Sequence, residues 1–270
     1  MRIGKQDTPY TAICAADASS ITVRGYDLCR DLIGKIDFVD YFFLLLMGKK
    51  PDEKQRFFIN ALLVAIAEHG LVPSVQAARM TLAAAPEAVQ GAVAAGLLGS
   101  GSVVFGSAEV VGRLLHDVVV ASEGTDPRTV ALERIRDMRK TKSPIPGFGH
   151  PQHSGGDPRA NVLLNLAGEH GLNGPYIGML RVIESVLPEA LGRPLPININ
   201  GAIPAILLEI GFPVTAMKSI SILARTAGLL AHLQEEMERA IGFIMSNAAA
   251  EAITYDGPLS TQLGKGEGAG

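Results

Sequence analysis

Apolar residues recur along most of the chain at the spacing of an α-helix. Phe57, Phe58, Ala61, Leu62 and Ala65 share one face of a helix that starts after Pro51, with acidic residues in its first turn. The same reading, with Gly and Pro at most of the ends, predicts further helices at residues 27–34, 38–47, 74–85, 86–98, 110–122, 129–139, 160–169, 175–187, 202–210 and 215–246. Within an irregular N-terminal arm, only residues 20–23 suggest a strand. The pattern therefore predicts an all-α fold.

A segment from Pro144 to Arg159 interrupts this helical pattern. It holds four glycines and four prolines in sixteen residues, so it cannot form a regular helix. It also carries His150, His153 and Asp157. A rigid loop with an imidazole at its centre is suited to holding a polar ligand, although a plain surface loop with two solvated histidines fits the composition as well.

Two further positions combine charge with a helical pattern. Arg225 and His232 are seven residues apart, so they share a face of the predicted 215–246 helix. Buried cations there need anionic partners, which could be a ligand carboxylate or a polar network within the core. His69 lies at the end of the helix that begins after Pro51, where it could simply cap helix carbonyls.

Composition narrows the class of protein. The 270 residues allow one large domain or two modest ones, and 47% of them are hydrophobic without any Trp, which favours close-packed helices. The net charge of −3 gives no basic field for nucleic acid. Cys14 and Cys29 form neither a disulfide framework nor a four-ligand zinc site, and no metal or nucleotide motif is visible.

The same features predict a soluble, cytoplasmic protein without a membrane partner. Residues 1–11 lack the apolar core of a signal peptide. The most apolar region, residues 102–121, is interrupted by charged side chains such as Glu109 and Arg113. Residues 264–270 read as a disordered tail.

The order of residues in the central segment resembles citrate synthases. Gly147-Phe148-Gly149-His150, followed by Asp157-Pro158-Arg159, resembles their G-x-G-H and D-P-R signature. Other stretches resemble that superfamily in the same order along nearly the whole chain: residues 21–26, 42–51, 68–70, 198–201 and 224–232.

Within this superfamily the chain looks most like stand-alone citryl-CoA lyases and the lyase module of ATP-citrate lyase. It is much shorter than a full citrate synthase, and Gly201 directly follows Asn198-Ile199-Asn200. Phe105 stands where the synthases carry the histidine of their H-G-G-A segment, as it does in the lyase module. The resemblance implies a two-lobed helical fold and a homodimer, with a large lobe of residues 1–111 and 213–270 and a small lobe of residues 112–212.

The implied activity is carbon–carbon lysis of citryl-CoA to acetyl-CoA and oxaloacetate, with coenzyme A as part of the thioester substrate and no metal. His150 would be the general base, because imidazole titrates near neutral pH. Asn200 falls where the family has an aspartate that moves a proton at the acetyl carbon. The remaining implied contacts are His69, Arg159, Arg225 and Phe105 for the acid, and Gly147, Phe148, Gly149 and Lys142 for coenzyme A.

Two alternatives stay open. One is an enzyme for another 3-hydroxy-3-carboxyacyl-CoA, which would keep His150 and change the pocket. The other is a non-catalytic homologue that binds coenzyme A or citrate, which Phe105 and Asn200 would permit. Lys142 also has a plainer explanation, as an ordinary surface charge.

Overall fold

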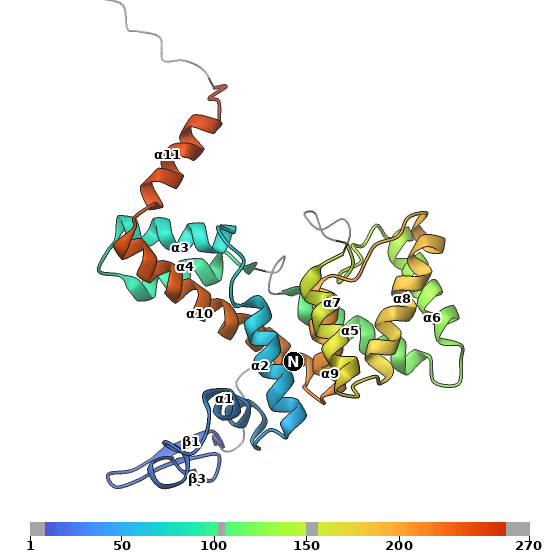
Figure 1. Ribbon diagram of the computed structural model, residues 1–270, viewed down its shortest axis with the longest axis horizontal. Helices are drawn as coiled ribbons and strands as arrows, with labels where there is room; N and C mark the ends of the chain where they lie inside the picture. The colour runs from blue at the N-terminus through green and yellow to red at the C-terminus, as the bar shows by residue number, and fades with distance from the viewer. Residues whose placement is uncertain (1–8, 102–105, 150–155, 258–270) are drawn as a thin grey trace, which may run out of the picture. The chain divides into compact units, whose positions relative to one another are not determined.

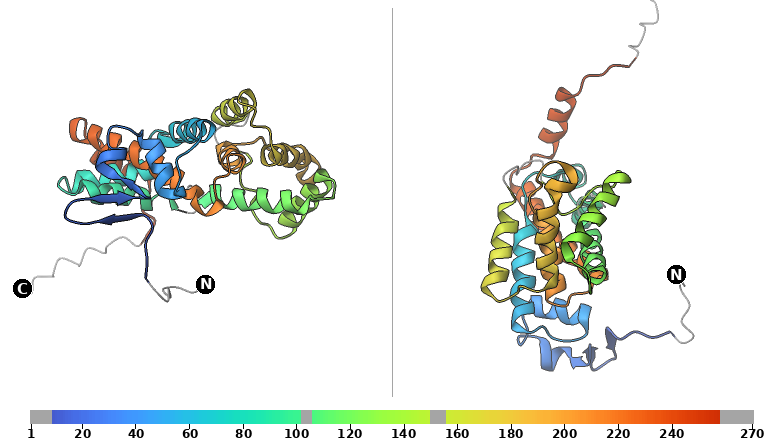
Figure 2. Two further views of the ribbon diagram at one scale, coloured as in Figure 1. Left: turned by 90° about the horizontal axis from the view of Figure 1, so that it is seen from below. Right: turned by 90° about the vertical axis from the view of Figure 1, so that its right-hand side faces the viewer.

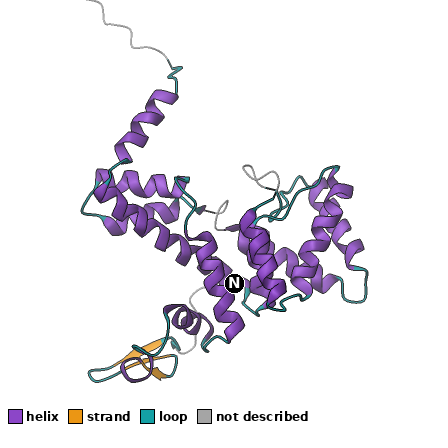
Figure 3. Ribbon diagram, viewed as in Figure 1, coloured by secondary structure: helices purple, strands orange, loops and turns teal. Residues whose placement is uncertain are grey.

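Helices form most of the chain, as the apolar spacing predicts (Figures 1 and 3). The computed structural model describes residues 9–101, 106–149 and 156–257. The α-helices are α1 (Phe38–Met47), α2 (Glu53–Ala67), α3 (Pro73–Ala84), α4 (Val89–Leu98), α5 (Gly106–Ala121), α6 (Pro127–Lys140), α7 (Pro158–Glu169), α8 (Pro175–Leu191), α9 (Ile199–Glu209), α10 (Met217–Glu238) and α11 (Gly242–Ala252). The all-α class is therefore confirmed.

The N-terminal arm is more ordered than the sequence suggests. Three short strands, β1 (Cys14–Ala16), β2 (Ile21–Val23) and β3 (Tyr26–Asp27), form an antiparallel sheet in which Cys14 pairs with Val23 (Figure 3). A π-helical turn, η1 (Leu28–Leu32), follows. Arg24 joins this arm to α1, because its guanidinium donates from Nε to the Leu45 carbonyl oxygen at 3.0 Å.

The chain divides into two compact units. The first comprises Met1–Gly70 and Ser100–Gly228, and the second comprises Leu71–Gly99 and Leu229–Gly270. The predicted small lobe, residues 112–212, falls wholly inside the first unit, and the division into two lobes stays a prediction.

Helix α9 is the centre of the first unit. It packs against α5, α7 and α8, which surround it (Figure 2). Its residues from Gly201 to Leu207 are all buried. Its C-terminal end is tied to two neighbours: Gln55 of α2 donates to the Ile210 carbonyl oxygen, and Glu209 accepts from the first backbone amides of α8. The position of Asn200 near the start of α9 is therefore fixed by packing.

The predicted 215–246 helix is wrong in one respect, since it is two helices. A short 3-10 helix, η3 (Val214–Ala216), leads into α10, which ends at Glu238, and α11 begins at Gly242. At the break, the Glu236 carboxylate accepts hydrogen bonds from the backbone amides of Ile241 and Gly242, which have no partners within the new helix.

Leucines of α10 show which side of this helix is buried. Leu230 is 49% exposed, whereas Leu229 and Leu233 are fully buried and pack with Val75 and Ala78 in the second unit. In the first unit, Met217 and Ile220 belong to the main core. The stretch Val214–Glu238 is long and apolar enough to cross a membrane by length and composition alone. A core helix passes the same test, and Met217, Ile220, Leu229 and Leu233 of α10 are buried in the two cores.

A buried ion pair holds the second unit together. Arg79 on α3 is 2% exposed, and its Nε donates to Glu236 Oε2 at 2.6 Å. Arg79 Nη1 donates to the half-exposed Glu235 at 2.8 Å. Burial raises the pKa of the Glu236 carboxyl, but hydrogen bonds from Arg79, Gly242 and Ile241 outweigh it and bring the pKa below its ordinary value.

We expect Glu236→Gln to lower the free energy of unfolding by about 3 kcal/mol, because it removes one partner of a buried ion pair. Glu235→Gln is the control and should cost under about 1 kcal/mol, since Glu235 is half exposed. Because the folded pKa of Glu236 is lowered, its contribution is complete above its ordinary pKa of 4.5 and is lost as the pH falls through the folded value. Denaturant titrations at pH 7 and pH 3 measure both effects, and equal costs for the two variants at pH 7 would contradict the assignment.

Candidate functional site

The described part of the predicted ligand loop is paired with the segment that precedes α9. Gly149 N donates to the Pro196 carbonyl oxygen at 2.7 Å, and Asn198 N donates to the Gly147 carbonyl oxygen at 3.0 Å. Between these bonds, Phe148 forms an isolated antiparallel bridge with Ile197. The loop is therefore held in place by its backbone, with two stretches nearly fifty residues apart side by side.

Gly147 and Gly201 make this pairing possible. Gly147 has a φ of +91°, which favours glycine, and a Cβ on Gly201 would lie 2.5 Å from the Gly147 carbonyl oxygen. Neither position has room for a side chain. Backbone packing alone therefore explains why both positions are glycine. The contact between Gly147 and coenzyme A is a separate prediction.

Asp157 is the best-connected polar residue of the site. Its side chain is fully buried and is the N-cap of α7. It accepts from Arg159 N at 3.1 Å, from Arg159 Nε at 3.0 Å and Nη2 at 2.9 Å, and from Ile199 N, the first amide of α9, at 3.1 Å. One carboxylate therefore joins the starts of two helices and fixes the Arg159 guanidinium.

The electrostatics of Asp157 follow from these contacts. Burial raises the pKa of its carboxyl, while the hydrogen bonds and charge of Arg159 and the Ile199 amide lower it by more, so the net pKa is below the ordinary 3.8. Asp157 is ionised at neutral pH, and Arg159 is largely neutralised by it. The sequence indicated Arg159 as a ligand for the acid, but it did not show that Arg159 is already paired with Asp157. Asp before Pro is nevertheless a recognisable signal for the start of a helix.

Asn200 lies in the first turn of α9, which starts at Ile199 instead of the predicted Ala202. Asn198 is the N-cap: its Oδ1 accepts from Asn200 N at 2.9 Å, and its Nδ2 donates to the Gly149 carbonyl oxygen. The half-buried Asn200 is thus placed next to the end of the predicted ligand loop.

Arg225, on α10, is the least satisfied charge in the described part of the first unit. It is 7% exposed, and its Nε and Nη1 have no hydrogen-bond partner there. Burial lowers the pKa of the guanidinium most; Glu68 opposes this effect, and the positive charge of Arg159 adds to it. A buried guanidinium with two unused donors is suited to binding an anion such as a carboxylate.

The end of α2 lies next to Arg225. Helix α2 ends at Ala67, and the Glu68 carboxylate accepts from the backbone amides of His69 and Gly70. His69 is exposed in this turn, beyond the helix end. Sequence reasoning selected His69 here and overlooked Glu68.

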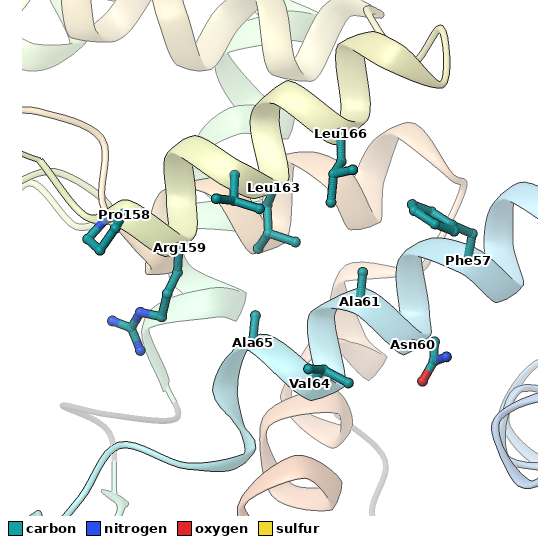
Figure 4. Close-up of a pocket in the computed structure, with 10 residues that line it drawn as sticks. Phe57, Asn60, Ala61, Val64, Ala65, Pro158, Arg159, Leu163 and Leu166 are labelled. Carbon is teal, nitrogen blue, oxygen red and sulfur yellow. The ribbon is translucent and has the colours of Figure 1, made fainter.

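A pocket of about 540 Å³ lies between α2 and α7 (Figure 4). Its walls are mainly apolar, with Phe57 at one end and Arg159 at the other, where the guanidinium points away from the apolar side chains. The His170 ring stacks on Phe57 with 4.1 Å between ring centroids. The remaining lining residues are Asn60, Ala61, Val64, Ala65, Pro158, Val162, Leu163 and Leu166.

The remaining predicted site residues either lie outside the described residues or have few contacts in the structure. His150, His153 and Phe105 lie outside the described residues. Lys142 is exposed just after α6 and has a positive φ of 55°. His232 lies on α10 within the second unit, where its Nδ1 is 3.4 Å from Arg79 Nη1. Its shared role with Arg225 stays a prediction. Among the described residues, no cluster of His, Cys, Asp or Glu could hold a metal ion.

The sequence matches the model of a known family over most of its length. The family model for the C-terminal domain of citrate synthase matches residues 35–244, so the chain belongs to the citrate synthase family. This finding confirms the resemblance stated from the motifs.

Several curated proteins are also similar in sequence to this chain. A citrate synthase of Haloferax volcanii is 28% identical over 200 residues, which are 73% of this chain and 51% of that protein. A 2-methylcitrate synthase of Mycobacterium tuberculosis is 26% identical and is matched over 74% of this chain and 50% of its own length. The chain spans about half the length of the curated relatives it matches.

Among solved structures, the citryl-CoA lyase from Hydrogenobacter thermophilus is similar along almost its whole length. The TM-score is 0.83 with 29% identity, covering 97% of this chain and 98% of that one. The ATP citrate lyase from Methanothrix soehngenii, in complex with citrate and coenzyme A, has a TM-score of 0.73 with 20% identity and covers 97% of this chain and 44% of that one. The second likeness shows the shared fold alone.

We expect Asp157→Asn to lower the free energy of unfolding by about 2–3 kcal/mol, because it leaves Arg159 without its buried partner. Asp126→Asn is a matched control: Asp126 also caps a helix before a proline but is exposed, and Asn caps almost as well. Chemical denaturation at pH 7 measures both. Since the folded pKa of Asp157 is lowered, the difference should vanish as the pH falls through that folded value. A cost for Asp126→Asn as large as that for Asp157→Asn would contradict the central role of Asp157.

Proposed function

We propose that this protein is a citryl-CoA lyase-like enzyme, which cleaves citryl-CoA into acetyl-CoA and oxaloacetate. The observation that carries the proposal is the end-to-end similarity to a citryl-CoA lyase at 29% identity, with nearly full coverage of both chains. The buried Arg225, with two unused donors, supports a carboxylate-bearing substrate.

The chemistry requires three groups. A base removes the proton of the tertiary hydroxyl, the adjacent carbon–carbon bond breaks to leave the ketone of oxaloacetate, and its electrons form the enolate of acetyl-CoA. Donors around the thioester oxygen stabilise that developing negative charge. A proton then reaches the enolate carbon. We assign the first role to His150, on its place in the loop motif.

Several residues of the first unit would recognise the substrate. Arg225 would bind a carboxylate directly, while Arg159, held and largely neutralised by Asp157, would contribute a second contact to the acid. His69 would donate a hydrogen bond to the acid. Coenzyme A enters as part of the thioester, with the backbone of Gly147–Gly149 and the exposed Lys142 as its proposed contacts. The proposal involves no metal.

A condensing enzyme is the second candidate. The curated relatives are named citrate synthase and 2-methylcitrate synthase, which favours carbon–carbon bond formation and allows another acyl group on the thioester. A non-catalytic homologue that binds coenzyme A or citrate is the third, and Phe105 and Asn200 favour it.

We also propose a homodimer in the cytoplasm. Helix α11 is exposed over nearly its whole length, with Phe243 at 69% and Ile244 at 64% exposure, and such an apolar face is suited to a second copy. Cys14 and Cys29 are both free and exposed, as is usual in a reducing compartment.

The test of function is turnover of citryl-CoA, followed through the oxaloacetate released, beside condensation assays with acetyl-CoA and propionyl-CoA. We expect cleavage of citryl-CoA to be the fastest reaction and His150→Ala to lower its rate by about 10²–10⁴-fold, because a general base is lost. Circular dichroism checks that the variant stays folded. Faster condensation with either acyl-CoA would favour the synthase, and the absence of any turnover would favour the binding protein.

Asn200 generates a separate prediction. An amide donates and accepts hydrogen bonds but cannot act as an acid or base near pH 7, so another group must protonate the enolate. Water, His153 and Glu109 are the candidates, and Glu109 is already paired with Arg113. Asn200 would then stabilise the enolate oxygen by a hydrogen bond.

We expect Asn200→Asp to leave the fold intact and to raise proton exchange at the methyl group of acetyl-CoA. The measurement is deuterium loss from labelled acetyl-CoA with oxaloacetate present. Fast exchange in the wild type that slows in Asn200→Asp would show that the proton-transfer role lies on another residue of the site.

A further inference from the structure

The buried positive charge of Arg225 needs a negative charge nearby to balance it before a substrate binds. Arg225 Nε and Nη1 have no hydrogen-bond partner in the described part of the chain. Asp157 does not serve, because its two oxygens accept from Arg159 and from the start of α9. A buried cation without a nearby anion would be costly, so another carboxylate is expected close by.

Gly228 identifies which carboxylate faces this part of α10. It follows Arg225 by three residues, so the two share a face of the helix. A Cβ on Gly228 would lie 2.1 Å from the Ala67 carbonyl oxygen and 3.1 Å from Glu68 Oε2. Helix α10 therefore approaches the end of α2 as closely as a backbone can, with the Glu68 carboxylate over the Arg225 face.

Glu68 is held in that position by its own turn. Its Oε1 accepts from His69 N at 2.8 Å and also from Gly70 N, which leaves Oε2 on the side of α10. Two backbone amides therefore hold this exposed carboxylate in place. The electrostatics agree, because Glu68 is the charge that counters the effect of burial on the pKa of Arg225.

We propose that Glu68 is the resident counter-charge of Arg225 and a specificity-determining residue for the acid. It positions the guanidinium in the empty site, and it opposes an incoming carboxylate because it keeps its negative charge beside the same cation. The acid affinity is then a balance between attraction to Arg225 and repulsion by Glu68. The inference rests on the proposed function in one respect, namely that the ligand is a di- or tricarboxylate.

The test uses Glu68→Gln, whose amide oxygen can still accept from the backbone while the charge is removed. We expect citrate to bind about five- to tenfold more tightly by calorimetry, with coenzyme A affinity unchanged. Damage to the structure would weaken binding, so the direction of the change separates the two explanations. Glu53→Gln removes one negative charge from an exposed position at the start of α2, and it should leave the citrate Kd unchanged.

A double-mutant cycle with Arg225→Gln completes the test and also works without ligand. In the Arg225→Gln background, Glu68→Gln should change citrate affinity by a different factor than in the wild type, because only the repulsion by Glu68 is left to remove. In denaturant unfolding of the free protein, the two positions should be coupled by about fivefold in the equilibrium constant. Absence of that coupling would overturn the inference.

Two further results are distinguishable. If the wild type binds citrate and Arg225→Gln abolishes binding, but Glu68→Gln binds citrate equally well or more weakly, the inference is overturned and the proposed function stands. If the wild type binds neither citrate nor oxaloacetate, the proposed function fails. Coupling in the free protein would then make Glu68 and Arg225 a purely structural pair, which also overturns the specificity role.

Discussion

The site depends on one buried carboxylate, that of Asp157. Its oxygens accept from the start of α7, from the guanidinium of Arg159 and from the start of α9. Because the first amides of a helix have no partners within the helix, an anion that satisfies two helix starts also fixes how those helices meet. The backbone pairing of Gly147–Gly149 with Pro196–Asn198 follows from this junction, since each segment leads into one of the two helices. The geometry around Asn200 is therefore a consequence of Asp157 more than of the ligand loop.

Much of this fold is readable from local sequence signals. Gly48, with a φ of +72°, ends α1 where predicted, and Pro158 opens α7 directly after its Asp cap. These signals act within one turn of the chain. The break between α10 and α11 was missed because Glu236 reaches forward to cap Gly242, and its own position depends on Arg79 in a helix over 150 residues earlier. Of the N-terminal sheet, only β2 was predicted, at residues 20–23; β1 and β3 were missed because strands of two or three residues are too short to show an alternating pattern.

The residues of the site also divide into those that the sequence could indicate and those that it could not. Arg225 could be selected because a charge on an apolar helix face is conspicuous, and its burial agrees with that reading. Glu68 could not be selected, because an exposed acidic residue after a helix is ordinary in sequence. Its importance comes from the close approach of Gly228, which lies 160 residues later and has no local signal of its own. Arg159 was identified as a cation, but the sequence does not show that Asp157 already neutralises it.

The sum of the described charges of the site bears on why an amide stands at position 200. Arg159 and Arg225 contribute two positive charges, and Asp157 and Glu68 contribute two negative ones, so the sum is zero. An aspartate at position 200 would suit the first turn of α9, where a carboxylate is stabilised by about 0.3–1 kcal/mol. Helix stability therefore gives no reason for the amide. An aspartate would, however, make the described site net negative, beside a Glu68 that already opposes an anionic acid. The amide keeps the site neutral, so that Arg225 can attract a carboxylate while Asn200 still offers a hydrogen bond to a developing enolate.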